Sequence, residues 1–425
     1  MNNIAIVGCG PAGLSAAIAL HDAGQKITLY EQFDQPAPVG SGLMLQPTGL
    51  RVLERFGLRA QAESLGQRID GMLGRVAPNG KVVLDINYRV LSNKLDGELY
   101  GVAIHRAALF DILYKAVQTR SIDIVTGKSI TGTVYHGVNQ DSDNKCTSQL
   151  LDSDGSLIEN QFDLVVDASG SRSKLAQHSG LLKKPKMLDY GALWATVELN
   201  DSSFDKTLLE QRYKRASVMV GVLPCGQIPD QDQPLATLFW SIRGDEYESF
   251  RAAGLDSWKK QVVNHWPAVA GLLENIKTID QLTHAVYTHH TLKQPHAPGI
   301  VFIGDAAHAT SPQLGQGANM AFLDALALSE AMSCANEHED YALLYAKSRQ
   351  LHVRLFQAAS YLLTPFYQSD SRLLPALRDS LFEPVSKLPL SDKIVTALGS
   401  GLISNPVRTI DNKVSRARRA TKKRV

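Results

Sequence analysis

The stretch IAIVGCGPAG at residues 4–13 decides the fold, and an alanine-rich run continues it to Leu20. Residues 4–7 form an apolar run of strand length, the glycines form a tight turn, and the run after Gly13 has the composition of a helix. In such a unit Gly8 permits the turn, Gly10 lets the backbone approach a pyrophosphate, and Gly13 lets helix and strand pack closely. Since the helix N-terminus then faces negative charge, the stretch predicts a dinucleotide site.

A second apolar strand over residues 26–30 ends at Glu31, where a carboxylate can accept both ribose hydroxyls of a dinucleotide. A lone GxGxxG motif is weak evidence, and an ordinary glycine turn is the alternative. The strand before it, the helix after it and the acid at the next strand end favour the dinucleotide. The residues expected to bind it are Gly8, Gly10, Pro11, Ala12, Gly13 and Glu31.

A second segment, GDAAHATSPQLGQGANM at residues 304–320, indicates which dinucleotide is bound. An apolar strand within residues 298–303 ends at Asp305, whose carboxylate can hold ribityl hydroxyls. The glycines let the backbone lie against a flavin ring, and the following helix points its positive end at the N1/C2 edge of that ring. Because NAD has no group that needs this second site, we predict FAD. The residues expected to contact it here are Gly304, Asp305, Pro312, Gly315, Gly317, Ala318 and Asn319.

The paired motifs resemble those of the single-component (group A) flavoprotein monooxygenases, which include the aromatic-ring and ubiquinone-pathway hydroxylases. The resemblance covers residues 1–345 and extends to Gly40-Ser41-Gly42-Leu43, whose counterpart reaches the isoalloxazine. It also extends to residues 105–109, where the family's arginine, here Arg106, contacts the phosphate side of the cofactor. It implies an α/β fold with a discontinuous Rossmann-like FAD-binding domain, an inserted β-sheet substrate domain and a helical C-terminal region.

The predicted domains follow from the positions of these motifs. The FAD-binding domain takes residues 1–70, 100–180 and 286–345, and the substrate domain takes residues 71–99 and 181–285. Strands are expected over 192–199, 216–223 and 235–242, because each of these apolar runs is bounded by turn residues. Residues 346–425 form the helical region, with helices over 351–363 and 391–402 packed against the FAD-binding domain and a basic tail over 413–424.

The sequence departs from the family pattern at one position, where the run 163–168 leads into Ser169-Gly170. The family has an aspartate at the position of Ser169, and that aspartate supports both FAD and the nicotinamide cofactor. The departure puts the usual delivery of hydride by NADH or NADPH in question, and a different reductant is the alternative.

The resemblance implies a mechanism in which NADH or NADPH reduces FAD and O₂ forms a C4a-hydroperoxyflavin that hydroxylates a small aromatic or quinone-precursor ring. Since the hydroperoxide decays in water, the site needs an apolar lid. Aromatic residues of the predicted strands are candidates for it, with core packing as the alternative role: Trp194, Phe239 and Trp240.

Other candidate catalytic residues are Pro312, placed beside the flavin face by its motif, and the tyrosines Tyr190 and Tyr213, which would help deprotonate a phenol. His308 is a candidate acid or base, since histidine side chains commonly serve in that role, although supporting the flavin loop is the stronger interpretation. The amides of Gln316 and Asn319 are expected to hold backbone or flavin, with helix capping as the alternative for Asn319.

The composition fits a cytoplasmic enzyme that is a monomer or a dimer. Of 425 residues, 44% are hydrophobic and 20% charged, and the formal net charge is +2. No uninterrupted apolar stretch predicts a transmembrane segment, no basic region opens a signal peptide, and the four cysteines lack metal-ligand or paired spacing. The basic tail carries no interleaved aromatic residues, so nucleic acid is not expected. We expect a solvated tail, with contact to an acidic partner or a membrane surface as the alternative.

Two other functions remain open from the sequence. One is a flavoprotein that acts on a partner protein or a macromolecule-tethered substrate with another reductant. The other is a flavin-dependent halogenase, suggested by Asp167-Ala168-Ser169-Gly170, although the tryptophan-x-tryptophan motif of halogenases is absent.

Overall fold

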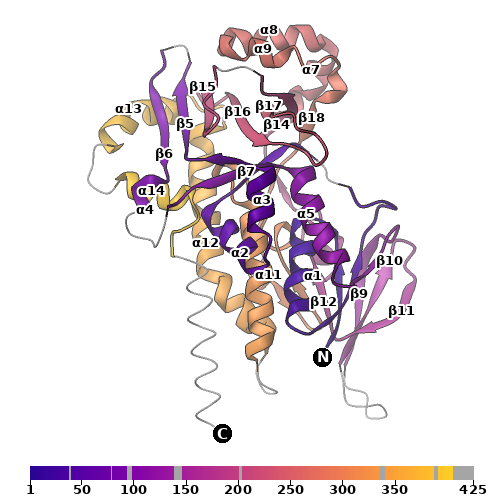
Figure 1. The fold of residues 1–425 in the computed structure, drawn as a ribbon. Helices are drawn as coiled ribbons and strands as arrows, with labels where there is room; N and C mark the ends of the chain where they lie inside the picture. The colour runs from indigo at the N-terminus through magenta and orange to yellow at the C-terminus, as the bar shows by residue number, and fades with distance from the viewer. Residues whose placement is uncertain are drawn as a thin grey trace.

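The protein has two large sheets joined by a small one, with helices on their outer faces (Figure 1). The computed structural model describes residues 1–425 except 38–39, 78, 93–97, 138–145, 201–202, 336–339, 387–390 and 405–425. The predicted basic tail therefore lies outside the described residues. The expected α/β fold is confirmed.

The first sheet contains the N-terminal strand at its centre. Its order is β20 (His296–Ala297), β21 (Ile300–Phe302), β12 (Leu164–Asp167), β1 (Asn3–Val7), β2 (Lys26–Tyr30) and β8 (Asp123–Val125). All pairs are parallel except β20 with β21. Parallel strands covered on both faces read as continuous apolar runs, as residues 4–7 do. The expected Rossmann-like arrangement is present.

Both faces of this sheet are covered. Ile4 and Ile6 pack with helices α1 (Pro11–Asp22), α5 (Arg106–Gln118) and α11 (Gly317–Cys334). Ala5 and Val7 pack on the other side with strands β9 (Ile130–His136), β10 (Thr147–Asp152) and β11 (Leu157–Phe162) and with helix α6 (Lys174–His178). The carboxyl ends of β1, β12 and β21 thus open at one edge of the sheet, where ligands bind in such folds.

The second large sheet has seven strands, and most of its pairs are antiparallel. Its order is β18 (Thr283–Ala285), β14 (Tyr190–Glu198), β17 (Leu235–Arg243), β16 (Val218–Gly226), β15 (Leu208–Lys214), β5 (Gly71–Val76) and β6 (Val82–Asn87). Its outer face is covered by α7 (Tyr247–Ala253), α8 (Leu255–His265) and α9 (Ala270–Leu273), seen at the top of Figure 1. Its inner face is turned toward the first sheet.

A small sheet connects the two large ones. It has the order β3 (Gly42–Leu45), β7 (Gly101–His105) and β4 (Gln67–Ile69), and its strands contact β16 of the seven-stranded sheet. Around it lie α2 (Pro47–Arg55), α3 (Arg59–Leu65) and α4 (Arg89–Ser92), and a two-stranded pair, β13 (Lys186–Met187) with β19 (Thr288–His289), lies farther along the chain. This arrangement places the loop before β3 and the start of α5 at the junction of the two large sheets.

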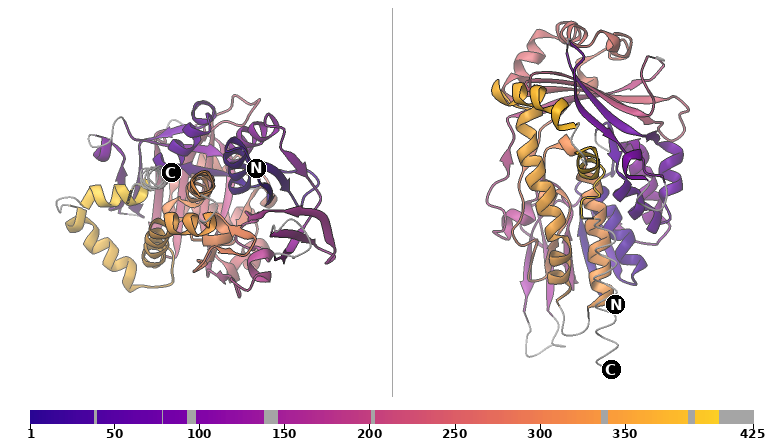
Figure 2. Two further views of the ribbon diagram at one scale, coloured as in Figure 1. Left: turned by 90° about the horizontal axis from the view of Figure 1, so that it is seen from below. Right: turned by 90° about the vertical axis from the view of Figure 1, so that its left-hand side faces the viewer.

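The C-terminal region is helical, as expected, with α12 (Tyr341–Tyr367), α13 (Leu373–Ser386) and α14 (Ser391–Gly399). Helix α12 packs on α11, but α13 and α14 contact β6 of the seven-stranded sheet. The expectation that both predicted helices pack on the FAD-binding domain is incomplete for α14: Leu398 packs with Met320 of α11, but Val395 and Ala397 join the cluster around Ile86 of the seven-stranded sheet. Figure 2 shows α12 and α13 on the same side of the molecule. Within the described ranges, no helix combines the length and apolarity needed to cross a bilayer.

Candidate active site

The glycine loop between β1 and α1 has the steric properties that the sequence predicted. Gly8 has φ +106°, and an added Cβ there would lie 2.7 Å from the Ala168 carbonyl oxygen. At Gly13 an added Cβ would lie 1.8 Å from the Gly8 carbonyl oxygen. At Gly10 it would meet no protein atom within 4 Å. Gly8 and Gly13 are thus required by the fold itself, whereas Gly10 leaves open space at the N-terminus of α1, where a diphosphate would bind.

Glu31 follows β2 and is held against this loop. One of its carboxylate oxygens accepts a hydrogen bond from the Cys9 amide at 2.8 Å, and the other accepts from the Phe33 amide at 3.1 Å. Burial, reinforced by the Glu31 charge, raises the pKa of the Cys9 thiol to about 12. Cys9 is therefore an uncharged filler of the loop, and the fixed carboxylate is available to a ribose.

Arg106 and Asp305 lie together at the junction of the sheets. Arg106 begins α5, and Asp305 begins α10 (Asp305–His308) directly after β21. Both side chains reach solvent, yet protein atoms surround them closely enough to shift their pKa values. Burial lowers the pKa of Arg106, and the nearby Asp305 and Tyr287 oppose this decrease. Burial raises the pKa of Asp305, and the nearby His308 and Arg106 oppose this increase. We infer that these two accessible yet enclosed charges line a cleft between the two large sheets.

These residues fit FAD by their chemistry. A guanidinium suits a diphosphate, and a carboxylate beside a helix start suits ribityl hydroxyls. Gly40 lies against Arg106, since an added Cβ would be 3.2 Å from the arginine Cδ. Gly42 donates its amide proton to Thr237 Oγ1 at 2.6 Å, which ties the start of β3 to the seven-stranded sheet, whereas the following Leu43 packs against the core of the first sheet. Bound FAD would therefore be held by Glu31, Arg106 and Asp305.

The second flavin loop continues from α10 to α11. Pro312 and Gly317 are exposed, and Gly315 has φ +60°, a conformation that glycine adopts without strain. Asn319 is fully buried; its amide group donates to the Met44 and Gly315 carbonyls and accepts from the Gln46 amide. Gln316 donates to the Gly399 carbonyl at 2.8 Å. Both amides hold backbone, and Asn319 is not the cap of α11.

His308 is turned away from the cleft, into a buried ionic network. Its Nε2 lies 2.6 Å from Asp324 Oδ2, and Arg349 Nε donates to Asp324 Oδ1 at 2.7 Å. Burial alone would raise the pKa of Asp324, but His308 and Arg349 hold it below its usual range. The burial of the His308 ring and its bond to Asp324 favour the predicted support of the flavin loop over a role as acid or base. Gln357 holds the same segment, since it donates to the carbonyl oxygen of His308.

The inner face of the seven-stranded sheet carries aromatic side chains toward the cleft. Trp194 Nε1 donates to the Tyr287 hydroxyl at 2.8 Å, and the rings of Trp194 and Phe239 are 4.9 Å apart. Tyr287 interacts with Arg106, which connects this aromatic group to the charged wall. Trp240 was expected beside them, but adjacent strand residues point to opposite faces. It packs under α8 with its ring 5.5 Å from His265, so its candidate catalytic role is wrong.

Neither candidate tyrosine is suited to deprotonate a phenol. The Tyr190 hydroxyl donates to Asp370 Oδ1 at 2.5 Å, and burial together with this bond raises the pKa of Tyr190. Tyr213 is fully buried and donates to Gln211 Oε1, and burial raises its pKa well above the usual value. A phenol whose pKa is raised is a poor source of phenolate. We withdraw both candidates.

Ser169 follows β12 and faces back toward that strand. Its amide and hydroxyl donate to Asp167 Oδ1 at 2.9 and 2.6 Å, and the Ser173 hydroxyl donates to the other oxygen of Asp167. Asp167 is fully buried, and burial raises its pKa while the three bonds oppose that rise. The turn is thus kept without the family's carboxylate at 169, which explains how serine is accommodated there.

Sequence reasoning missed Tyr287, Thr237 and the partner residues of His308. Tyr287 and Thr237 lie in no motif: Thr237 is placed by the register of β17 in the seven-stranded sheet, and Tyr287 lies in the connection between β18 and β19. A signal existed for Asp324, since a charged residue inside the apolar run of α11 needs a buried partner, but not for Arg349, which lies among other polar residues of α12.

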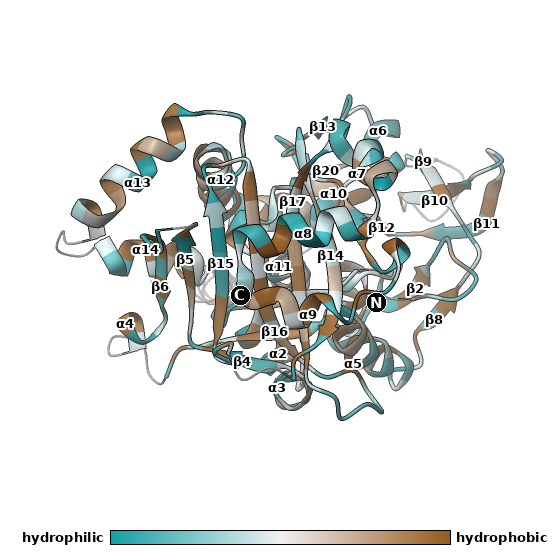
Figure 3. Cartoon of the chain, turned by 90° about the horizontal axis from the view of Figure 1, so that it is seen from above, coloured by the Kyte–Doolittle hydropathy of each residue, from teal (hydrophilic) through white to brown (hydrophobic). Residues whose placement is uncertain are grey.

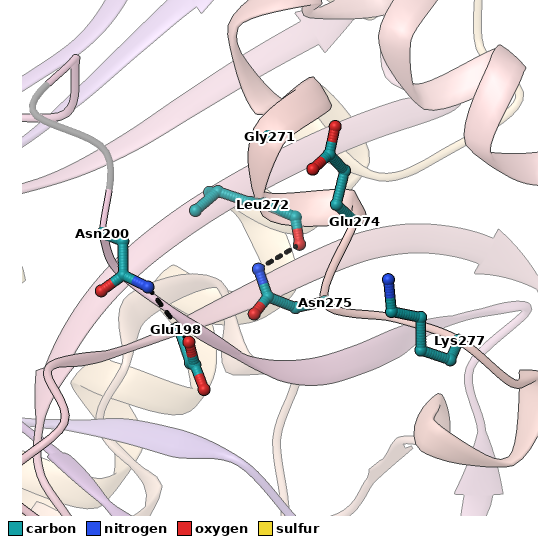
Figure 4. A pocket seen from close by; sticks show the side chains of 7 residues that line it. All are labelled: Glu198, Asn200, Gly271, Leu272, Glu274, Asn275 and Lys277. Carbon is teal, nitrogen blue, oxygen red and sulfur yellow. Dashed lines mark hydrogen bonds between the residues drawn. The ribbon is translucent and has the colours of Figure 1, made fainter.

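A separate groove of about 550 Å³ lies on the far side of the seven-stranded sheet, at the end of β14 and beside α9 (Figure 4). Several of its polar groups bond within the protein: Asn200 donates to Glu198, and Asn275 donates to the Leu272 carbonyl. None of the predicted cofactor residues lines it. The cleft around Arg106 and Asp305 is therefore the candidate active site.

The fold and cleft define a flavoprotein with a Rossmann-like sheet roofed by a second sheet. The family model described as the FAD binding domain matches residues 1–357. A putative FAD-dependent monooxygenase, YetM of Bacillus subtilis, is 27% identical, with 82% of this chain and 89% of the relative covered. An FAD-dependent urate hydroxylase of Mycolicibacterium vanbaalenii is 25% identical, with 79% and 80% covered.

The solved structure of Klebsiella pneumoniae HpxO complexed with FAD and uric acid is 18% identical, with a TM-score of 0.75 over 95% of this chain and 97% of the other, and it shows the shared fold. The chain belongs to the FAD-binding-domain family of FAD-dependent (group A) monooxygenases, with FAD as its cofactor.

Proposed function

We propose that this protein hydroxylates an aromatic or quinone-precursor small molecule, with NADH or NADPH as the electron donor and O₂ as the oxidant. The observation that carries the proposal is the aromatic inner face of the seven-stranded sheet, where Trp194 is bonded to Tyr287 and Tyr287 interacts with Arg106. A flat substrate ring would stack on such side chains. The relatives support the reaction class, since one is named a urate hydroxylase.

The protein's own residues bind and exclude water in this proposal. Glu31 and Arg106 would hold the nucleotide end of FAD and Asp305 the ribityl chain, while the loop that ends at Gly42 and Leu43 would lie beside the flavin ring, tied to the seven-stranded sheet by the bond from Gly42 to Thr237. Trp194 and Phe239 keep the reacting ring dry, which favours oxygen transfer over loss of peroxide. When bound, FAD supplies the redox chemistry: it takes up two electrons and passes one oxygen atom of O₂ to the substrate. Pro312 is exposed in the flavin loop and stays a proposed contact of the ring.

Ser169 favours a second candidate, in which another reductant serves FAD and the substrate is attached to a partner macromolecule. Its hydroxyl is bonded to Asp167, so position 169 offers no carboxylate to a nicotinamide cofactor.

The test is aerobic turnover of the FAD-loaded enzyme with NADH or NADPH and a panel of phenols, hydroxypyridines and hydroxyquinolines. Oxygen uptake, peroxide and ¹⁸O in the product would be measured under ¹⁸O₂. The proposal predicts that one ring class gives a product with one ¹⁸O atom and little peroxide. If NADH or NADPH is oxidised but only peroxide forms with every compound of the panel, the proposal is wrong.

A further inference from the structure

A glycine in the middle of a central strand lies directly beneath one of the aromatic side chains of the cleft. Gly221 of β16 is the cross-strand neighbour of Phe239 of β17. An added Cβ at Gly221 would lie 1.9 Å from Phe239 Cζ and 2.4 and 2.5 Å from the two Cε atoms of that ring. The tip of the Phe239 ring therefore occupies the space in which any other residue at position 221 would place its side chain.

Phe239 stands between two contacts that join the seven-stranded sheet to the rest of the candidate active site. Its neighbour on β14 is Trp194, whose ring lies 4.9 Å away and whose Nε1 donates to the Tyr287 hydroxyl. Thr237, two residues earlier on the same face of β17, accepts the amide proton of Gly42. Phe239 thus belongs to the part of the inner face that borders the cleft.

The Phe239 ring is enclosed on its other sides, so a side chain at position 221 could move it in one direction. Trp194 lies beside it, and Met219 and Tyr213 pack with it in one buried cluster. Beneath it is the backbone of the sheet, and α8 and α9 cover the opposite face, which Figure 3 shows from above. A larger residue at 221 would therefore push the ring away from the sheet, into the space between the two large sheets.

We propose that Gly221 sets the width of the substrate ring that the cleft admits, because it lets the Phe239 ring lie against β16. This inference rests on the proposed function, since it requires an aromatic substrate beside Trp194 and Phe239. Gly221 is a positioning residue, since it has no side chain to touch the substrate and acts through Phe239. A displaced Phe239 ring would narrow the cleft, which excludes a fused two-ring substrate more strongly than a single ring.

The competing explanation is structural, because an aromatic ring packed on a cross-strand neighbour also stabilises a sheet. Gly74 of β5 provides the comparison, since an added Cβ there would lie 2.7 Å from Tyr213 Cε2. Tyr213 is fully buried, and its ring packs 5.3 Å from that of Tyr367. A purely structural role predicts the same result for alanine at 74 and at 221, namely a lower Tm and no change in the preferred size of ring.

The test measures the Kd of a one-ring phenol and of a two-ring hydroxyquinoline for the FAD-loaded enzyme, from the change that each causes in the flavin absorbance. The Kd of the hydroxyquinoline divided by the Kd of the phenol gives the ring-size ratio. Gly221→Ala should raise this ratio on the order of tenfold, because the overpacking acts mainly on the wider ring. Gly74→Ala, the matched control, should lower Tm and leave the ratio unchanged.

Two further variants test whether Gly221 acts through Phe239, and they keep the test decisive if Gly221→Ala does not fold. Phe239→Leu should lower the ring-size ratio, because the shorter side chain leaves more room for a wide ring. When Gly221→Ala is added to Phe239→Leu, the ratio should not change further, because leucine does not extend to the position of the added Cβ.

An unchanged ratio in Gly221→Ala, or an equal change in Gly74→Ala, would overturn the inference. An effect of Gly221→Ala that persists in the Phe239→Leu background would overturn it as well. Failure of the proposed function gives a different result, in which the rings bind and the ratio shifts but no ring gains ¹⁸O. If no ring of the panel binds the wild-type enzyme, both the inference and the proposed function are wrong.

Discussion

Substitution of Gly10 by alanine should weaken FAD binding while leaving the apoprotein almost unchanged. The added Cβ meets no protein atom within 4 Å, and φ at Gly10 is −82°, which alanine adopts freely. Loss of glycine at the N-cap costs about 1 kcal/mol, which for a chain of this length lowers Tm by about 1 °C. A methyl group in the space for the diphosphate should act like overpacking, at about 1–3 kcal/mol. FAD affinity would then fall roughly tenfold to a hundredfold.

Fluorescence titration of the apoprotein with FAD measures the affinity, and differential scanning calorimetry measures Tm. Gly137→Ala is the matched control, because an added Cβ there also meets nothing and the position lies after β9. Gly13→Ala should instead lower Tm of the apoprotein by several degrees, since its Cβ would lie 1.8 Å from the Gly8 carbonyl oxygen. Wild-type FAD affinity in Gly10→Ala would refute the assignment of this loop to the diphosphate.

Three further predictions concern the network behind the flavin loop and the sheet above it. Asp324→Asn should destabilise the apoprotein by about 3–5 kcal/mol in chemical denaturation, because it leaves Arg349 buried without its carboxylate; unchanged stability would contradict this. Burial, aided by the charge of Arg349, lowers the pKa of His352 to about 3. Between pH 6.5 and pH 3, His352 therefore binds a proton in the unfolded state but not in the native state. Stability should therefore fall with acidification by up to about 1.4 kcal/mol per pH unit, and His352→Gln should flatten this slope in denaturation curves across that window. Trp194→Ala should raise the peroxide yield and KM in turnover assays, whereas Trp240→Ala should lower only Tm. The reverse result would contradict the assignment of Trp194 to the substrate side of the sheet and of Trp240 to the side covered by α8.

Local sequence was enough to predict the elements around the two flavin motifs. The strand, glycine turn and helix at residues 4–20 are determined by neighbouring residues, and so is the strand end at Asp305. The clash that makes Gly13 obligatory involves Gly8, five residues away, so it too is local. The binding roles of these residues and the domain boundaries stay predictions.

Properties that depend on distant residues could not be predicted. Periodicity assigns Phe239 and Trp240 to opposite faces of one strand, but it does not say which face is covered by α8 or which of the two residues shares its face with Trp194. His308 looked like an acid or base, because its partners Asp324 and Arg349 come from other helices. The enclosure of Arg106 results from β3, α5 and β19 meeting at the junction of the sheets, which no single segment specifies.

The central claim is that a nicotinamide cofactor and an aromatic substrate work together on the FAD held at Arg106 and Asp305. Anaerobic stopped-flow reduction by NADH and by NADPH, with and without the aromatic panel, tests this most directly through the bleaching of flavin absorbance. The account predicts rapid reduction that one class of aromatic ring accelerates. Reduction that stays negligible under every condition would contradict it and would mean that Ser169 marks a true loss of pyridine-nucleotide use.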